Sequence, residues 1–161
     1  MSSSAAPFDD THALKCELAC EVLRSSGTLR LKVMGWSMLP SVWPGDTLVV
    51  ESADSSAVSK GDIVLFGRDR RLFAHRVVSK HARPGDSHLV TRGDAMSAPD
   101  SPLAEDEVLG KVSLILRDGT CIAPRRRLRF PERAVAALVR GSETAARVLV
   151  GVHGMRQASQ A

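Results

Sequence analysis

A succession of short segments that are candidate β-strands occupies most of the chain between residues 28 and 117. The first, "TLRLKV", alternates polar and apolar residues, and a period of two places successive side chains on opposite faces of an extended backbone, as in a half-buried β-strand. Gly-Asp, Pro-Gly-Asp and Ser/Asp-rich stretches, which favour turns, separate the segments. The segments cover residues 28–33, 47–51, 62–66, 71–78, 87–92 and 107–117. The pattern predicts a mainly β fold, either a twisted sheet or a partly open barrel.

Helical patterns flank the strands on both sides. The first covers residues 11–25, where Leu14, Leu18 and Leu23 belong to an apolar band at helical spacing. The second covers residues 131–150, which follow a basic stretch and carry a narrow polar stripe on an otherwise small and apolar helix. We therefore divide the chain into a disordered tail (1–10), an N-terminal helix (11–26), a β domain (27–122), and a basic segment with a C-terminal helix (123–152).

Composition limits the classes of function. A length of 161 residues with 43% apolar content suits one domain with one core. Aromatic residues make up only 4%, and tyrosine is absent, which argues against a nucleic-acid binder that stacks bases. Three cysteines without a CxxC pair, and histidines without ligand spacing, favour neither a disulfide framework nor a zinc site. We expect no cofactor, no metal and no nucleic-acid partner.

The net charge of +4 arises in residues 117–133, which hold six arginines against two acids. The run of arginines at 125–129 either forms a solvated face or meets the phosphates of lipid or nucleic acid. The N-terminus lacks the apolar core of a signal peptide, and no run reaches the roughly 20 apolar residues that span a bilayer. We expect a soluble, cytoplasmic protein with at most weak peripheral contact with a membrane.

The stretch "GWSMLP" at residues 35–40 places a serine in a tight turn between two predicted strands. A serine hydroxyl becomes a nucleophile when a base takes its proton and a third group orients that base. His75, inside an apolar strand, has the side chain that best serves as a base near neutral pH. Gly35 would let a substrate approach the backbone closely, and the Ser37 N–H is a natural donor to an oxyanion. Residue types alone favour a turn serine and a buried structural histidine, because any chain of this length contains some Ser, His and Asp.

Five motifs in order carry a resemblance to a known family. They are "GWSMLP" with the following "PGD", then "KGDIVLF", "HRVV", "TRGD" with a later Asp, and "VLGKV". Over about residues 28–116 the chain resembles the signal peptidase I superfamily, the S24/S26 serine peptidases, which includes the LexA-type self-cleaving repressors. The resemblance implies a mainly β fold and a serine endopeptidase that cleaves after small residues.

Two catalytic styles exist in that superfamily, a Ser–Lys pair and a Ser–His pair. "AHRVV" is similar to the second style, found in the archaeal and endoplasmic-reticulum signal peptidases. The resemblance implies Ser37 as nucleophile, His75 as general base, Asp100 as the acid of the triad and Asp94 as a supporting acid. It also implies that Gly35, Trp36 and Met38 bind substrate or stabilise the oxyanion. Lys60 and Lys80 are the alternative bases, although Lys60 sits in a Gly-Asp turn where it would be solvated.

The chain departs from the family pattern in two places. "GDAM" at residues 93–96 stands where relatives have "GDNN", and the sequence shows no N-terminal membrane anchor. We therefore expect an endopeptidase of signal-peptidase type whose peptide or protein substrate adds as a strand to a sheet edge. Two alternatives stay open: a self-cleaving protein of the LexA or UmuD kind, and an inactive module that binds peptides.

Overall fold

The computed structural model describes residues 7–83, 86–142 and 151. Its strands form one antiparallel sheet with the order β1-β2-β6-β3-β4-β5, and β7 pairs with β6. The sheet is not closed, because β1 and β5 each pair with a single neighbour. The elements are α1 (Pro7–Ser26), β1 (Thr28–Lys32), β2 (Thr47–Ser52), β3 (Ile63–Arg68), β4 (Arg71–Arg83), β5 (Asp86–Arg92), β6 (Val108–Arg117), β7 (Thr120–Ile122) and α2 (Phe130–Gly141), with single 3-10 turns at Ser55–Ala57 and Glu105–Glu107.

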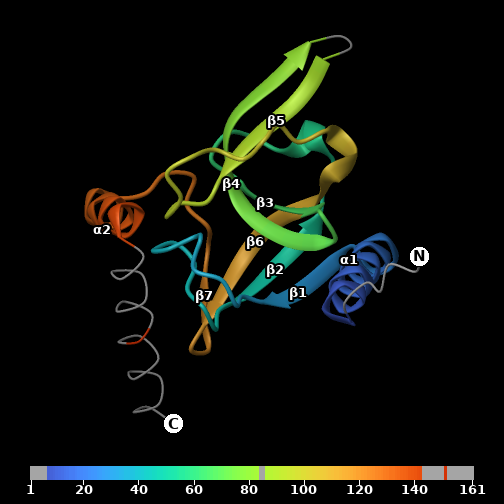
Figure 1. Ribbon diagram of the computed structural model, residues 1–161, viewed down its shortest axis with the longest axis horizontal. Helices are drawn as coiled ribbons and strands as arrows, with labels where there is room; N and C mark the ends of the chain where they lie inside the picture. The colour runs from blue at the N-terminus through green and yellow to red at the C-terminus, as the bar shows by residue number, and fades with distance from the viewer. Residues whose placement is uncertain (1–6, 84–85, 143–150, 152–161) are drawn as a thin grey trace, which may run out of the picture.

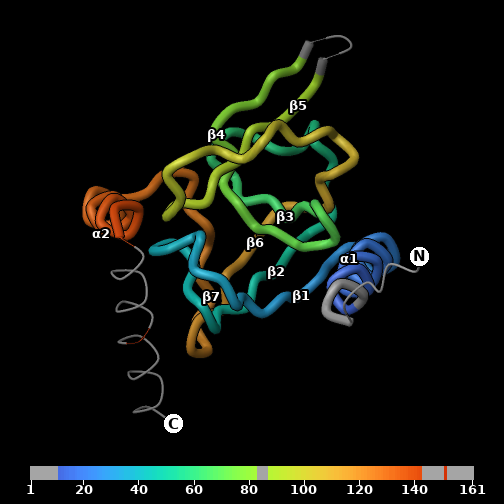
Figure 2. The backbone as a smooth tube through the Cα atoms, in the orientation of Figure 1, coloured from blue at the N-terminus to red at the C-terminus, as the bar shows by residue number. Residues whose placement is uncertain are grey.

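The two helices lie on opposite sides of the sheet (Figure 1). Helix α1 lies beside β1 and the start of β4, and α2 lies against the loops at the other side. The far half of β4 and β5 extend away from the body as a hairpin, which the backbone trace shows clearly (Figure 2). The sheet therefore curls around a centre near β3, and this places the start of β4 opposite β1.

Strand β3 is buried on both faces, which explains why its sequence is a continuous apolar run. Ile63 and Leu65 belong to a core that also contains Leu23 of α1. Val64 and Phe66 belong to a second core under the β4–β5 hairpin. A strand covered on both faces has no solvent-facing side that would favour polar residues, so the alternation disappears there.

The mainly β fold predicted from the sequence is confirmed. All six predicted strands are present, whereas the three-residue strand β7 was not predicted. Helix α1 begins at Pro7, four residues before the expected start, so residues 7–10 are helical and not part of a disordered tail. Residues 1–6 and 143–150, the latter within the expected C-terminal helix, lie outside the described residues.

The apolar band along α1 is buried only in part. Leu14 and Leu18 are 64% and 60% exposed, whereas Ala19 and Leu23 are buried. Helix α1 lies beside an edge of the sheet, so only its narrow sheet-facing side is covered. Among the described helices, none is long and apolar enough to span a bilayer.

Candidate active site

Buried neighbours fix the turn that carries Ser37. Met38, Leu39 and Val42 are 3%, 0% and 1% exposed, so the residues after the serine anchor the turn in the core. Two backbone hydrogen bonds close it, from Leu39 N to Trp36 O at 3.1 Å and from Val42 N to Met38 O at 3.0 Å. Ser37 itself is only half-buried. The sequence therefore folds into a rigid turn with the hydroxyl-bearing residue at its open side.

Ser37, His75 and Asp100 form one hydrogen-bonded chain. Ser37 Oγ lies 3.0 Å from His75 Nε2, and Asp100 Oδ2 lies 2.7 Å from His75 Nδ1. The imidazole on β4 packs against the stacked rings of Phe66 and Phe73, whose centroids are 5.8 and 5.9 Å from its own. His75 is 6% exposed. The three side chains come from the turn after β1, from β4 and from the loop after β5, and the fold brings them together.

A second donor fixes the carboxylate of Asp100. Thr91 Oγ1 donates a hydrogen bond of 2.6 Å to the same oxygen, Oδ2, that faces His75. Partial burial acts to raise the pKa of Asp100, but hydrogen bonds from His75 and Thr91 and the charges of His75 and Arg68 outweigh it, so the pKa is lowered. A carboxylate only accepts hydrogen bonds, so Nδ1 of His75 carries a proton. In the neutral imidazole, the lone pair of Nε2 then faces Ser37.

Asp94 does not contact His75; it forms a buried ion pair with Arg76. The Arg76 guanidinium donates from Nε to Oδ1 at 2.8 Å and from Nη2 to Oδ2 at 2.7 Å, and Ser41 Oγ donates to Oδ2 at 2.5 Å. Arg76 also donates to the carbonyls of Gly61, at 2.8 Å, and Arg125. Asp94 is 5% exposed and Arg76 8%. This ion pair ties four separate segments together beneath the site.

The loop that carries Asp94 packs directly on the backbone of Ser37. Ala95 N donates to Ser37 O at 2.9 Å, and a Cβ at position 93 would lie 2.5 Å from that same oxygen. Only glycine therefore fits at position 93 without a shift of the turn. On the other side of the loop, the Arg140 guanidinium of α2 donates two hydrogen bonds to Asp94 O, at 3.1 and 3.0 Å. The serine turn is thus held from behind by a braced loop.

A cleft of about 640 Å³ opens in front of Ser37 and His75. Gly35 and Met38 line it at this end, as the resemblance implies for residues that meet substrate. Trp36 does not line it: its side chain packs against the small cluster of Leu39 and other residues behind the turn. The remaining lining comes from α1, β1 and the first half of β4, together with apolar side chains of the core: His12, Lys15, Leu31, Lys32, Val33, Met34, Val42, Leu48, Leu65, Arg71, Leu72, Phe73 and Ala74.

The two alternative bases lie elsewhere. Lys80 Nζ donates to the carbonyls of Ser55, Ser56 and Val58 at 2.8, 3.2 and 2.9 Å, so it braces the 3-10 turn. Lys60 is exposed in the turn before β3 and lines no part of the cleft. Among the described residues, no group of three or more His, Cys, Asp or Glu side chains could hold a metal ion.

Sequence reasoning missed Arg76, Thr91 and Gly93 as parts of this site. A signal existed for Arg76, because an arginine inside an apolar strand is buried only when it is paired. Thr91 and Gly93 stand in the quoted "TRGD" motif, but their roles depend on contacts with residues nine and 56 positions away.

Comparison with known proteins places this site in a family. The profile of the Peptidase S24-like family matches residues 4–113, about two thirds of the chain, and this range includes Ser37, His75 and Asp100. A search of curated proteins found no match. On the strength of the family profile, the chain belongs to the Peptidase S24-like family, a family of serine peptidases.

Proposed function

We propose that the protein is a serine endopeptidase in which Ser37 is the nucleophile, His75 the general base and Asp100 the orienting acid. The observation that carries the proposal is the continuous hydrogen-bonded chain from Ser37 Oγ through both ring nitrogens of His75 to Asp100. A nucleophile within reach of a base that a third group orients is the arrangement that acyl transfer requires.

The reaction follows from these positions. His75 Nε2 takes the proton of Ser37 Oγ as the oxygen attacks the scissile carbonyl carbon, and the imidazolium then protonates the leaving amine. Water, deprotonated by the same nitrogen, releases the acyl group from Ser37. Asp100 stays ionised throughout, in keeping with its lowered pKa, and stabilises the imidazolium. Within the described residues the Ser37 N–H makes no hydrogen bond, so it is available to the oxyanion.

Two unpaired strand edges support binding of an extended peptide. Among the described residues, β1 pairs only with β2, and the ladder between β4 and β5 begins at Arg76, so β4 before this residue pairs only with β3. Both free edges border the cleft. An added peptide strand gains main-chain hydrogen bonds from such an edge. The buried side chains of Met38 and Leu48 line the cleft, which favours small substrate residues beside Ser37.

These features favour a peptidase of the Ser–His signal-peptidase type over the Ser–Lys type. His75 occupies the place of the base, and both candidate lysines are remote from Ser37. The experiment is digestion of a complex peptide library by the wild type and by Ser37→Ala, followed by mass spectrometry of the new termini. We expect cleavage after small residues by the wild type and a loss on the order of a millionfold in kcat for the variant. Similar product patterns from both proteins would refute the proposal.

Self-cleavage is the second candidate, and the position of α1 favours it. His12 and Lys15 of this helix line the same cleft as Ser37, so the N-terminal part of α1 borders the cleft. Incubation of the purified protein, followed by intact mass measurement, tests this directly. An intramolecular reaction proceeds at a rate that does not depend on protein concentration, whereas cleavage of one molecule by another accelerates with concentration. If neither intramolecular nor intermolecular cleavage occurs and peptide binding is retained, the inactive peptide-binding module is the remaining alternative.

A further inference from the structure

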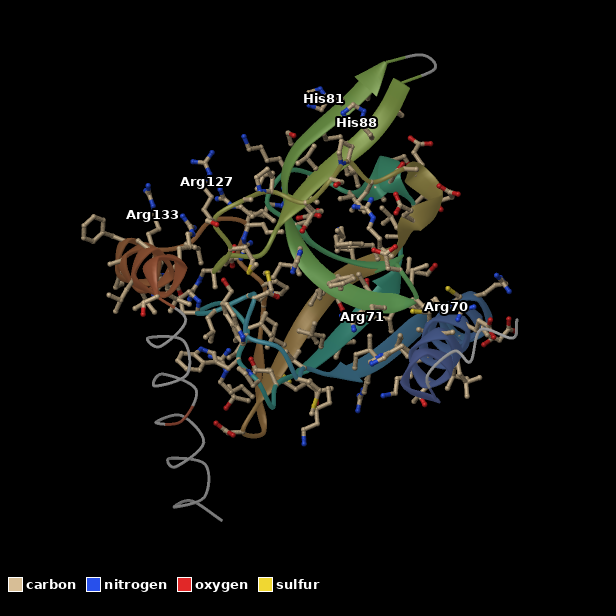
Figure 3. All side chains as sticks on the ribbon, in the orientation of Figure 1. Arg70, Arg71, His81, His88, Arg127 and Arg133 are labelled. Atoms are coloured by element: carbon tan, nitrogen blue, oxygen red, sulfur yellow. The ribbon has the colours of Figure 1, made fainter. Side chains whose placement is uncertain are left out.

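Basic side chains line the cleft in front of Ser37. Arg71 lies at the start of β4, beside α1, as Figure 3 shows. It is four residues before His75 on the same strand, which places it about 13 Å along the cleft at 3.3 Å per residue. Lys15 and His12 reach the cleft from α1, and Lys32 reaches it from the end of β1. Four basic side chains from three elements therefore border the cleft; we call them the basic rim.

Among the residues that the structure describes, no neighbour neutralises the charges of the basic rim. Within the described part of the chain, the side chains of Lys15, Lys32 and Arg71 have no hydrogen bond or ion pair, and no acidic residue lines the cleft. Elsewhere most buried or half-buried arginines are paired: Arg68 with Glu107, Arg76 with Asp94, and Arg117 with Asp46. A cleft lined by charge of one sign creates a potential that attracts the opposite sign.

We propose that the basic rim is a subsite for a carboxylate side chain of the substrate, about four residues from the scissile bond. The proposal rests on the proposed function of the cleft as the site of an extended peptide. Side chains at i and i+4 of a strand point to the same side, so Arg71 and His75 face the same side of the added strand. The substrate residue aligned with Arg71 then presents its side chain to the basic rim. The planar guanidinium of Arg71 matches a carboxylate in two hydrogen bonds.

The expected effect is moderate and sensitive to salt. Single exposed ion pairs change affinity by a factor of about 1.5 to 5, so three cations acting together give about tenfold at low ionic strength. The Debye length falls from about 30 Å at 0.01 M salt to about 3 Å at 1 M. The preference for an acidic substrate should therefore disappear at high salt, whereas main-chain and apolar contacts in the cleft persist.

Binding to the Ser37→Ala variant tests the proposal without turnover. The probes are fluorescent Ala/Val peptides of about twelve residues, long enough to pass the cleft on both sides of Ser37. A single Glu is moved one position at a time, each peptide has a Gln twin, and all are amidated so that no terminal carboxylate contributes. At one register we expect the Glu peptide to bind about tenfold more tightly than its Gln twin, and at 1 M salt less than about twofold more tightly. After Arg71→Glu, the Gln peptide should bind more tightly than the Glu peptide.

A matched variant controls for net charge. Arg30 is exposed on β1 and does not line the cleft, so Arg30→Gln should leave the ratio between Glu and Gln peptides unchanged. Equal affinity of Glu and Gln peptides at every register, or no binding of either up to about 1 mM, would overturn the proposal. Loss of the ratio in Arg30→Gln would also overturn it, because the effect would then be one of overall charge. Cleavage by wild type and Ser37→Ala is measured separately, so failure of the catalytic proposal is recognised independently.

Discussion

Changing each of the two carboxylates near the site to its amide should affect a different property of the protein. Asp94 and Asp100 are six residues apart in the sequence, but their partners differ completely. Asp94 neutralises the buried guanidinium of Arg76, and Asp100 accepts from the imidazole of His75. We therefore predict that Asp94→Asn lowers the free energy of unfolding, whereas Asp100→Asn lowers kcat.

The size of the first effect follows from burial. The side chains of Arg76 and Asp94 are 10% and 5% exposed, and the guanidinium donates two of its hydrogen bonds to this carboxylate. Removal of one partner of a buried ion pair costs about 3–5 kcal/mol, because the remaining charge is uncompensated. A domain of this size loses about 2–4 °C in Tm per kcal/mol, so Tm should fall by about 6–20 °C.

The second effect acts on the position of the proton on the His75 imidazole. An asparagine at position 100 can donate to Nδ1, which favours the tautomer whose Nε2 carries the proton and cannot accept one from Ser37. In the worked serine-protease case, the equivalent change of the acid costs about 10⁴ in kcat. The side chain of Asp100 is 25% exposed, against 5% for Asp94, so Tm should fall less than in Asp94→Asn.

Thermal unfolding by circular dichroism and kcat/KM on a cleaved peptide measure the two effects on the same preparations. Asp54→Asn is the control, because Asp54 is exposed and its side chain makes no capping hydrogen bond. The reasoning would be refuted if Asp94→Asn unfolded at the wild-type temperature but lost more activity than Asp100→Asn.

Three further predictions follow from particular contacts. Gly93→Ala should lower Tm, since its Cβ would meet the backbone of Ser37, whereas Gly35→Ala meets nothing within 4 Å and should change only kcat/KM; equal Tm for both would contradict this. The folded-state pKa values of Asp100 and Glu107 are lowered, so their stabilisation is complete above the unfolded carboxyl value near 4 and is lost as pH falls below it. Urea titrations at several pH values should show that the free energy of unfolding declines less steeply with falling pH when both residues are changed to amides. The same pH dependence in the wild type and the double variant would contradict the prediction. We also propose weak contact of residues 125–129 with anionic membranes. Each basic residue contributes about 1 kcal/mol at low salt, so the protein should float with anionic vesicles at low salt and not at about 1 M salt. Flotation that persists at high salt would indicate apolar insertion.

The strands were predictable because each is long enough for its alternation, or in β3 its continuous apolar run, to be read. Strand β7 is three residues long, which is too short for any period, and its pairing depends on the preceding turn at Asp118 and Gly119. The band on α1 was misread in part, because a helical period shows which residues share a face but not how much of that face a sheet edge covers. Leu14 and Leu18 are exposed for this reason.

The candidate triad was predictable from a resemblance, but its support was not. Ser37 and His75 stand in recognisable motifs, whereas only its position six residues after Asp94 pointed to Asp100. The bracing role of Arg76 depends on four segments that only the fold brings together. The basic rim likewise combines α1, β1 and β4, which no local pattern relates.

Reaction with a fluorophosphonate probe tests most directly whether His75 activates Ser37, because it needs no knowledge of the substrate. The probe phosphonylates an activated serine oxygen with loss of fluoride, and peptide mass spectrometry locates the adduct. The account predicts an adduct on Ser37 of the folded wild type, none on nearby Ser41, and a large loss of labelling in His75→Ala at unchanged fold. Labelling of His75→Ala at the wild-type rate, or no adduct on Ser37 of the wild type, would contradict it.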